Sequence, residues 1–202
     1  MRKWTRQDYQ TMPWKNGGGS TTELAVFPTE ADLDHFVWRL STAEVSTDGP
    51  FSHFNQVDRT LAILSGDGLI LHSDSEQSHA QSIFLRQDSL PHQFSGETPI
   101  NAELLRGTVL DLNMMTRRDV CTHYMQRLEA GSHFIEANDA QQLLLFCAKG
   151  SARLSTGESL QDYDCCLFDE EHEHAGIRLN LHAAEDAVLY LIRIRFLTTG
   201  DS

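Results

Sequence analysis

Polar residues alternate with other residues along two segments that have the pattern of β-strands. Arg39 and Ser41 are two positions apart in one segment, and Asp111 and Asn113 are two positions apart in the other. Side chains two apart lie on one face of a strand, so each segment has a polar face. The opposite face of the second segment consists of Leu and Met side chains. Such a polar face is either solvated or lines the interior of a small barrel, and the residue pattern favours neither.

Arg59 follows Asp58 at the start of a further strand-like segment. The planar guanidinium of an arginine presents a fork of donors that suits a carboxylate. A salt bridge to an acidic neighbour at the barrel rim is the alternative, because the chain is rich in acidic residues.

A run of three glycines leads into the apolar segment 24–27. Glycines in a row cost backbone entropy, and they are typical of a turn with positive φ or of a close backbone approach. A phosphate-binding loop is excluded because no Lys-Ser/Thr follows at the required spacing. We expect a structural motif that packs against the first half of the chain and fixes the mouth of a barrel there. Its residues are Trp14, Asn16, Gly17, Gly18 and Gly19.

The histidines lack the spacing of a typical metal site. The segment 52–59 contains only His53, and His92 stands alone, whereas a zinc site needs three or four ligands. His172 and His174 alternate within an acidic run typical of an exposed loop. No G-x-S-x-G nucleophile motif is present. We therefore expect no metal and no cofactor, and we assign no catalytic residue.

The chain is almost entirely strand-like and contains an internal repeat. Gly66-Asp67-Gly68 between two apolar runs predicts a β-hairpin. The segment beginning at Gly49 has an echo beginning at Gly131, and 61–66 has an echo at 143–150. Two weaker echoes match 82–88 with 165–169 and 109–112 with 188–191. Two similar units side by side follow from this. We expect an N-terminal barrel over residues 1–119 and a mainly structural C-terminal barrel over residues 120–202.

The second copy lacks the polar features of the first. It has Gln141, Gln142 and Leu143 where the first has Arg59, and it has Tyr190, Ile192 and Ile194 in place of a polar strand face. Any ligand pocket is therefore expected in the first copy.

Composition excludes several classes of partner. The 202 residues include 16 Lys and Arg against 29 Asp and Glu, a formal net charge of −13. Such a chain lacks the basic face that binds nucleic acid, and anionic membranes would repel it. Its four cysteines form no Cys-x-x-Cys pair, which favours reduced thiols, and no signal peptide is apparent. We expect a cytoplasmic protein, with a homodimer through an exposed edge strand as an open alternative.

The chain resembles the HutD/Ves family over about its first three-fifths, and the last third matches only in pattern. The resemblance implies two cupin-type double-stranded β-barrels (jelly rolls) in one chain, and a role linked to histidine utilisation or stress response. It also favours a barrel interior over a solvated face for the polar strands. Its motifs are Trp-x-Asn-Gly-Gly-Gly-x-Thr-x-Glu at 14–23, Trp38-Arg39-x-Ser41-x-Ala43, Gly49-Pro50-Phe51-Ser52, Asp58-Arg59, Gly66-x-Gly68, Phe94-x-Gly96 and Asp111-x-Asn113-x-Met115-x-Arg117-Arg118.

These observations lead to a metal-independent protein that binds a small carboxylate metabolite and senses or modulates amino-acid catabolism. The resemblance suggests a ligand like urocanate or a formylated glutamate. Arg39 and Arg59 would hold the carboxylate. The expected polar contacts and apolar walls are Glu23, Ser41, Ser52, Asp111 and Asn113, with Phe54 and Phe94.

Two other classes of function stay open. One is a cupin-type isomerase or hydrolase with Asp111 or Glu23 as the base. The other is a structural or protein-interaction role, with the barrel interior filled by side chains.

Overall fold

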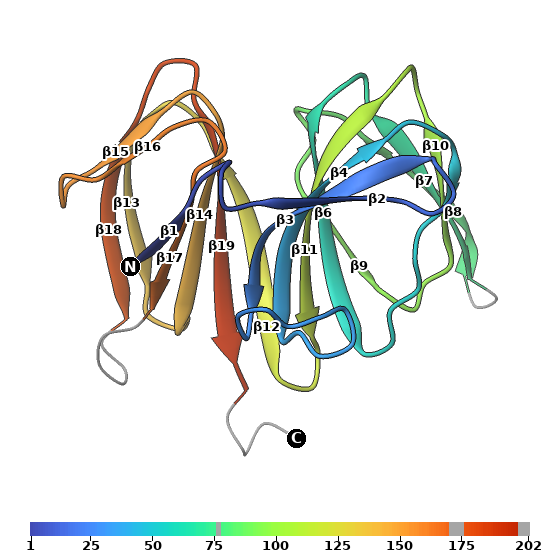
Figure 1. Ribbon diagram of the computed structural model, residues 1–202, viewed down its shortest axis with the longest axis horizontal. Coiled ribbons are helices and arrows are strands. Elements are labelled where there is room, and N and C mark those ends of the chain that lie inside the picture. The colour runs from blue at the N-terminus through green and yellow to red at the C-terminus, as the bar shows by residue number, and fades with distance from the viewer. Residues whose placement is uncertain (76–77, 170–175, 198–202) are drawn as a thin grey trace. The chain divides into compact units, whose positions relative to one another are not determined.

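The computed structural model describes residues 1–75, 78–169 and 176–197, and within these the fold is all-β (Figure 1). These residues form nineteen strands and no helix. His172 and His174 lie outside the described residues.

The chain divides into two compact units, Gln10–Asp119 and Met1–Tyr9 with Val120–Ser202. Each unit consists of two antiparallel sheets, as in a cupin barrel. The sequence groups residues 1–9 with the N-terminal half, but β1 (Arg2–Trp4) pairs with β17 (Cys165–Asp169) in the C-terminal unit.

The N-terminal unit has a six-stranded and a four-stranded sheet. The six-stranded sheet has the order β2 (Gln10–Pro13), β3 (Gly19–Phe27), β4 (Trp38–Val45), β11 (Val109–Arg117), β6 (Val57–Ser65) and β9 (His92–Ser95). The four-stranded sheet has the order β5 (Gly49–Pro50), β10 (Ile100–Leu104), β7 (Leu69–Ser75) and β8 (Ser78–Leu85).

The C-terminal unit has a five-stranded and a four-stranded sheet. The five-stranded sheet has the order β1, β17, β14 (Gln142–Lys149), β19 (Val188–Phe196) and β12 (Cys121–Leu128). The four-stranded sheet has the order β13 (Gly131–Ala137), β18 (Ile177–Ala183), β15 (Ala152–Leu154) and β16 (Ser159–Leu160).

The predicted hairpin around Gly66-Asp67-Gly68 is wrong. β6 belongs to the six-stranded sheet and β7 to the four-stranded sheet, so the turn carries the chain from one sheet to the other. Gly66 and Gly68 have positive φ, and a Cβ on Gly66 would lie 2.6 Å from the carbonyl oxygen of Thr108. The two glycines therefore allow the positive φ and the close backbone approach that this connection between the sheets requires.

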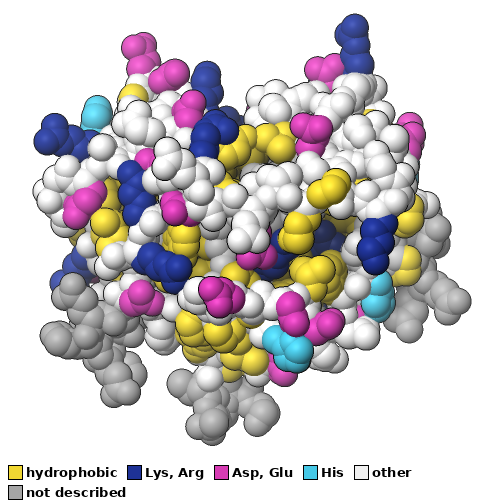
Figure 2. Space-filling view, in the orientation of Figure 1, with side chains coloured by type: hydrophobic (Ala, Val, Ile, Leu, Met, Phe, Trp, Pro, Cys, Tyr) yellow, Lys and Arg dark blue, Asp and Glu magenta, His cyan; other side chains and the backbone are white. Residues whose placement is uncertain are grey.

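Apolar side chains from both sheets form the core of each unit. In the N-terminal unit, Leu61 and Ile63 of β6 pack with Leu69 and Leu71 of β7. The inner face of β6 therefore points toward the four-stranded sheet. The C-terminal core contains Leu143, Leu145, Leu189 and Leu191 together with side chains of β13, β15 and β18. Charged side chains of both signs are scattered over the visible face (Figure 2).

Candidate functional site

The strand register places the predicted polar residues on the inner face of the six-stranded sheet. Arg59 and Arg39 both pair with Met115, and Ser41 pairs with Asn113. Residues opposite one another in an antiparallel pair project to the same face. Arg59 is also two positions from Leu61, which belongs to the core of the unit. The polar side chains thus line the interior of the N-terminal barrel.

Arg59 is held in a frame of aromatic rings. Its guanidinium carbon lies 5.1 Å from the ring centroid of Phe51, 5.5 Å from that of Phe54 and 5.1 Å from that of Phe94. Its Nη1 donates to the backbone carbonyl of Ser52 at 3.1 Å. Such contacts stabilise a cation inside an apolar wall. They leave the Arg59 Nε buried and without a hydrogen-bond partner among the described residues.

Ser52 contributes its backbone rather than its side chain to this frame. Its carbonyl oxygen accepts from Arg59, while the residue itself is exposed. Phe51 completes the frame and was missed in the choice of site residues. It belongs to the Gly49-Pro50-Phe51-Ser52 motif, three positions before Phe54, and that signal was available in the sequence.

Asp111 and Asn113 present two further unsatisfied polar atoms on the same face. Each has a buried Oδ1 that accepts no hydrogen bond from the residues that the structure describes. Burial raises the pKa of Asp111 from 3.8 to about 7, although the positive charge of Arg59 and a backbone hydrogen bond from Ala43 act against it. Burial also lowers the pKa of Arg59 to about 10, and Asp111 partly opposes this. Asp111 is therefore poised to carry a proton near neutral pH.

Arg39 has a partner of its own on this face. Its Nε donates to Glu23 Oε2 at 2.7 Å, and its Nη1 approaches Ser41 Oγ at 3.4 Å. Arg39 is 5% exposed, so this ion pair is largely shielded from solvent. Glu23 thus balances the charge of Arg39, whereas no ion pair of Arg59 with an acidic side chain is seen within the described ranges.

The C-terminal barrel has leucines at the positions of Arg59, Asp111 and Asn113. One residue bulges out of β6 where Leu110 pairs with Ser65 and Asp111 pairs with Ile63. The same bulge occurs in β14, where Val188 pairs with Lys149 and Leu189 pairs with Cys147. Aligning the bulges matches Arg59, Asp111 and Asn113 with Leu143, Leu189 and Leu191, which are at most 1% exposed.

This alignment corrects the predicted register of the repeat. The match of 109–112 with 188–191 is off by one residue, which turned Tyr190, Ile192 and Ile194 toward the wrong face. The counterpart of β17 is β9, and not the end of β8, because both are the outer neighbours of the strands with the bulge. The interior of the C-terminal barrel is apolar, and its core contains Leu189 and Leu191.

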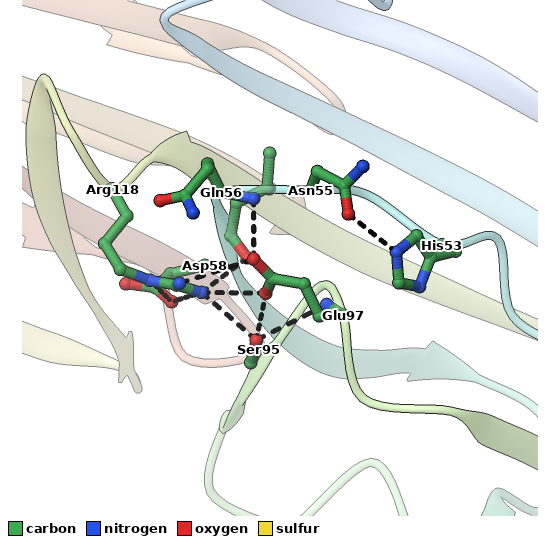
Figure 3. A network of polar contacts seen from close by, with 8 residues as sticks. His53, Asn55, Gln56, Asp58, Ser95, Glu97 and Arg118 are labelled. Carbon is green, nitrogen blue, oxygen red and sulfur yellow. Dashed lines mark hydrogen bonds and ion pairs between the residues drawn. The ribbon is translucent and has the colours of Figure 1, made fainter.

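A polar network holds the loop that carries the aromatic frame (Figure 3). Arg118 pairs with Asp58 at 2.9 Å and with Glu97 at 3.0 Å, and it donates to Ser95 Oγ at 3.1 Å. Glu97 Oε1 accepts from the backbone nitrogen of Gln56 at 2.6 Å. Hydrogen bonds from Arg118 and Ser95 lower the pKa of Glu97 to about 2. Asp58 is thus the rim salt bridge, while the adjacent Arg59 points inward.

The glycine motif forms the turn between β2 and β3. Trp14 closes this turn, with its indole Nε1 donating to Thr21 Oγ1 at 2.8 Å. Gly18 N donates to Asn16 Oδ1 at 3.0 Å, and Gly17 supplies a φ of +72°. A Cβ on Gly19 would collide with the carbonyl oxygen of Glu44 and meet the Trp14 ring at 3.1 Å. Gly19 is therefore required by close approach to β4.

Comparison with known proteins identifies the family to which the chain belongs. The HutD family pattern matches residues 6–190. The chain belongs to the HutD family. A protein from the hutC 3′ region of Pseudomonas putida is 34% identical over 86% of this chain and 89% of its own length. Protein Ves of Escherichia fergusonii is 31% identical over 82% of this chain and 83% of its own.

Solved structures agree with this HutD assignment. HutD from Pseudomonas fluorescens SBW25, in a formate condition, is 27% identical, with a TM-score of 0.80 over 98% of this chain and 99% of that one. Oxalate decarboxylase from Bacillus subtilis is 9% identical, with a TM-score of 0.65 over 96% of this chain and 76% of that one. The latter likeness concerns the fold alone and agrees with the expected cupin-type barrels.

The described part of this HutD-family chain offers no cluster of three His, Cys, Asp or Glu side chains that could hold a metal ion. His53 instead bonds Asn55 Oδ1 at 2.8 Å at the surface (Figure 3). The four cysteines are free and buried. No helix among the described residues is long and apolar enough to cross a bilayer.

Proposed function

We propose that the N-terminal barrel binds a small organic acid, with Arg59 as its anchor. One observation carries the proposal. Three buried polar atoms on one inner face, Arg59 Nε, Asp111 Oδ1 and Asn113 Oδ1, have no hydrogen-bond partner among the residues that the structure describes. Unpaired buried polar atoms are costly, and the C-terminal barrel fills the equivalent positions with leucines. A polar molecule bound between these atoms would offset that cost.

The charges of the inner face favour an anion. Glu23 balances Arg39, and Arg59 keeps a net positive charge when Asp111 holds its proton, which it does below its pKa of about 7. A protonated carboxyl can also donate a hydrogen bond, which an anionic oxygen would accept. A carboxylate matches both features because the guanidinium presents paired donors to two oxygens. Arg39, held by Glu23, is then a second wall of the site rather than a free cation.

The relatives suggest where such binding would matter. HutD is the name of the family, one relative comes from a hutC region, and others are called Ves. We place the protein as a cytoplasmic sensor or modulator of amino-acid catabolism, with urocanate or a formylated glutamate as candidate ligands. Formate is a minimal probe because it is a carboxylate with no further group.

Thermal unfolding and isothermal titration with formate, acetate, urocanate and N-formyl-L-glutamate test this proposal. At least one acid should raise the melting temperature of the wild type. Arg59→Lys should lose most of that shift, since lysine keeps the charge but not the fork. Arg106→Lys, at an exposed arginine of the same unit, is the matched control and should keep it.

Asn113→Leu covers the case in which Arg59→Lys folds poorly. It installs the residue of the C-terminal barrel, so it should fold and bind acids less tightly. Full retention of the ligand shift in both variants would place the site elsewhere.

A second candidate function rests on the Asp111 carboxyl. A buried acid with a pKa of about 7 beside a cation suits a general acid or base. In that case the wild type would convert one of the bound acids, and Asp111→Asn would bind it without turnover. Unchanged ligand after prolonged incubation with the wild type would favour binding alone.

A further inference from the structure

An open groove of about 670 Å³ crosses the outer face of the four-stranded sheet of the C-terminal unit. Its floor lies on β13 and β18, and the turn between β15 and β16 forms one wall. Small-molecule sites are typically concave and about 300–1,000 Å³ in volume. The groove belongs to the C-terminal unit alone and is separate from the interior of the N-terminal barrel.

The lining of this groove is basic, in contrast to the chain as a whole. The chain has a net charge of −13, yet none of the described residues that line the groove is acidic, whereas Arg153 and His182 line it. Arg153 is exposed and makes no ion pair with an acidic side chain in the ranges that the structure describes. An anion would meet here the positive charge that most of this surface lacks.

The register places the polar groups in one row across three strands. Ser132 pairs with His182, and His182 pairs with Arg153. Ser132 Oγ lies 3.0 Å from His182 Nδ1, which fixes the imidazole and leaves its Nε2 available to a ligand. Directly opposite residues on one face of a sheet are about 5 Å apart, so one anionic group can reach both Arg153 and His182.

An apolar wall stands beside this row. Phe134 is 66% exposed, and it pairs with Asn180, two positions along β18 from His182. Exposed aromatic rings next to a cation suit a flat apolar group that carries a negative charge. Both Phe134 and Asn180 line the groove.

We propose that this groove is a second ligand site, which takes a small aromatic or conjugated carboxylate. The carboxylate lies over Arg153 and His182, and the flat apolar part lies against Phe134. This inference does not depend on the site in the N-terminal barrel.

Titration calorimetry with benzoate tests the groove, with benzyl alcohol as the uncharged comparison. Arg153→Gln should weaken benzoate binding about tenfold or more, because it removes a charged hydrogen bond. Phe134→Ala should weaken it about threefold through loss of ring contact. Arg178→Gln, at an exposed arginine of β18 that pairs with Glu136 and does not line the groove, should leave binding unchanged.

Arg59→Lys separates the two sites. The proposal requires that the groove keeps its affinity for benzoate in this variant. Binding lost in Arg59→Lys and kept in Arg153→Gln would overturn the groove site while supporting the one in the N-terminal barrel. No measurable binding of benzoate to the wild type, or equal affinity for benzyl alcohol, would also overturn it. So would a concentration-dependent dimer that Phe134→Ala abolishes, since a second copy would then occupy the groove.

Discussion

Asp111→Asn should make the free energy of unfolding of the N-terminal unit less dependent on pH. Burial raises the pKa of this carboxyl from 3.8 to about 7. The native state therefore holds the proton more tightly than the unfolded chain does, and stability falls as the pH rises from 4 to 7. Each pKa unit corresponds to about 1.36 kcal/mol. The rise of the Asp111 pKa from 3.8 to about 7 therefore lowers the unfolding free energy of the wild type by about 4 kcal/mol at pH 8. Asparagine has the shape of the protonated acid and does not ionise, so the variant does not lose this stability as the pH rises.

Urea unfolding followed by tryptophan fluorescence from pH 4 to pH 8 measures the effect. A Trp4→Phe background leaves Trp14 and Trp38, both in the N-terminal unit, as the reporters. The advantage of Asp111→Asn over its parent should be near zero at pH 4 and reach about 4 kcal/mol at pH 8. Asp67→Asn, at an exposed position between β6 and β7, is the control and should follow the parent. A difference that stays constant with pH would refute the argument that Asp111 titrates inside the barrel.

Three further outcomes are expected. Protein purified without a histidine tag should contain no stoichiometric transition metal, and elemental analysis that finds about one iron, zinc or manganese per chain would contradict this. Gly19→Ala should lower the unfolding free energy by about 2 kcal/mol or more, because its methyl group meets the Glu44 carbonyl. Unchanged stability of this variant would show that the turn can adapt to a side chain. Glu97→Gln should release the loop of the aromatic frame and weaken carboxylate binding severalfold in calorimetry. The control is Glu103→Gln, at an exposed glutamate of the same unit. Equal affinities of the two variants would show that the loop does not need Glu97.

The polar strand faces could be predicted from the residue pattern because their signal is local, whereas their place in the barrel interior rested on the family resemblance. Alternation of Arg39 with Ser41, and of Asp111 with Asn113, follows from the strand period of two, and the strands themselves are strongly apolar. The direction of Arg59 required the resemblance as well, since Asp58 and Arg59 are neighbours and point to opposite faces.

Strand bulges and pairing between distant segments could not be predicted from the sequence. One residue bulges out of β6 and one out of β14, and each bulge shifts the register by one position. A slip of one residue exchanges the two faces of a strand. This is why Tyr190 was matched with Asp111 in place of Leu189. The turn at Gly66 has the composition of a hairpin, but β6 pairs with β11 and β9 while β7 pairs with β10 and β8, so the turn joins two sheets.

The pairing of β1 with β17 makes the N-terminal unit an insertion within the C-terminal one. The chain leaves the C-terminal unit after Tyr9 and returns to it at Val120, so both ends of the inserted unit are tethered to one body. During synthesis the inserted unit emerges before β1 can meet its partner strand, and the β1 edge of the C-terminal sheet closes only after β17 has been made. A fusion partner or tag at Met1 therefore lies beside the β1 edge of the C-terminal sheet and not beside the barrel that follows it in sequence. Lys3 and Asp164 form an ion pair at 2.7 Å at this edge.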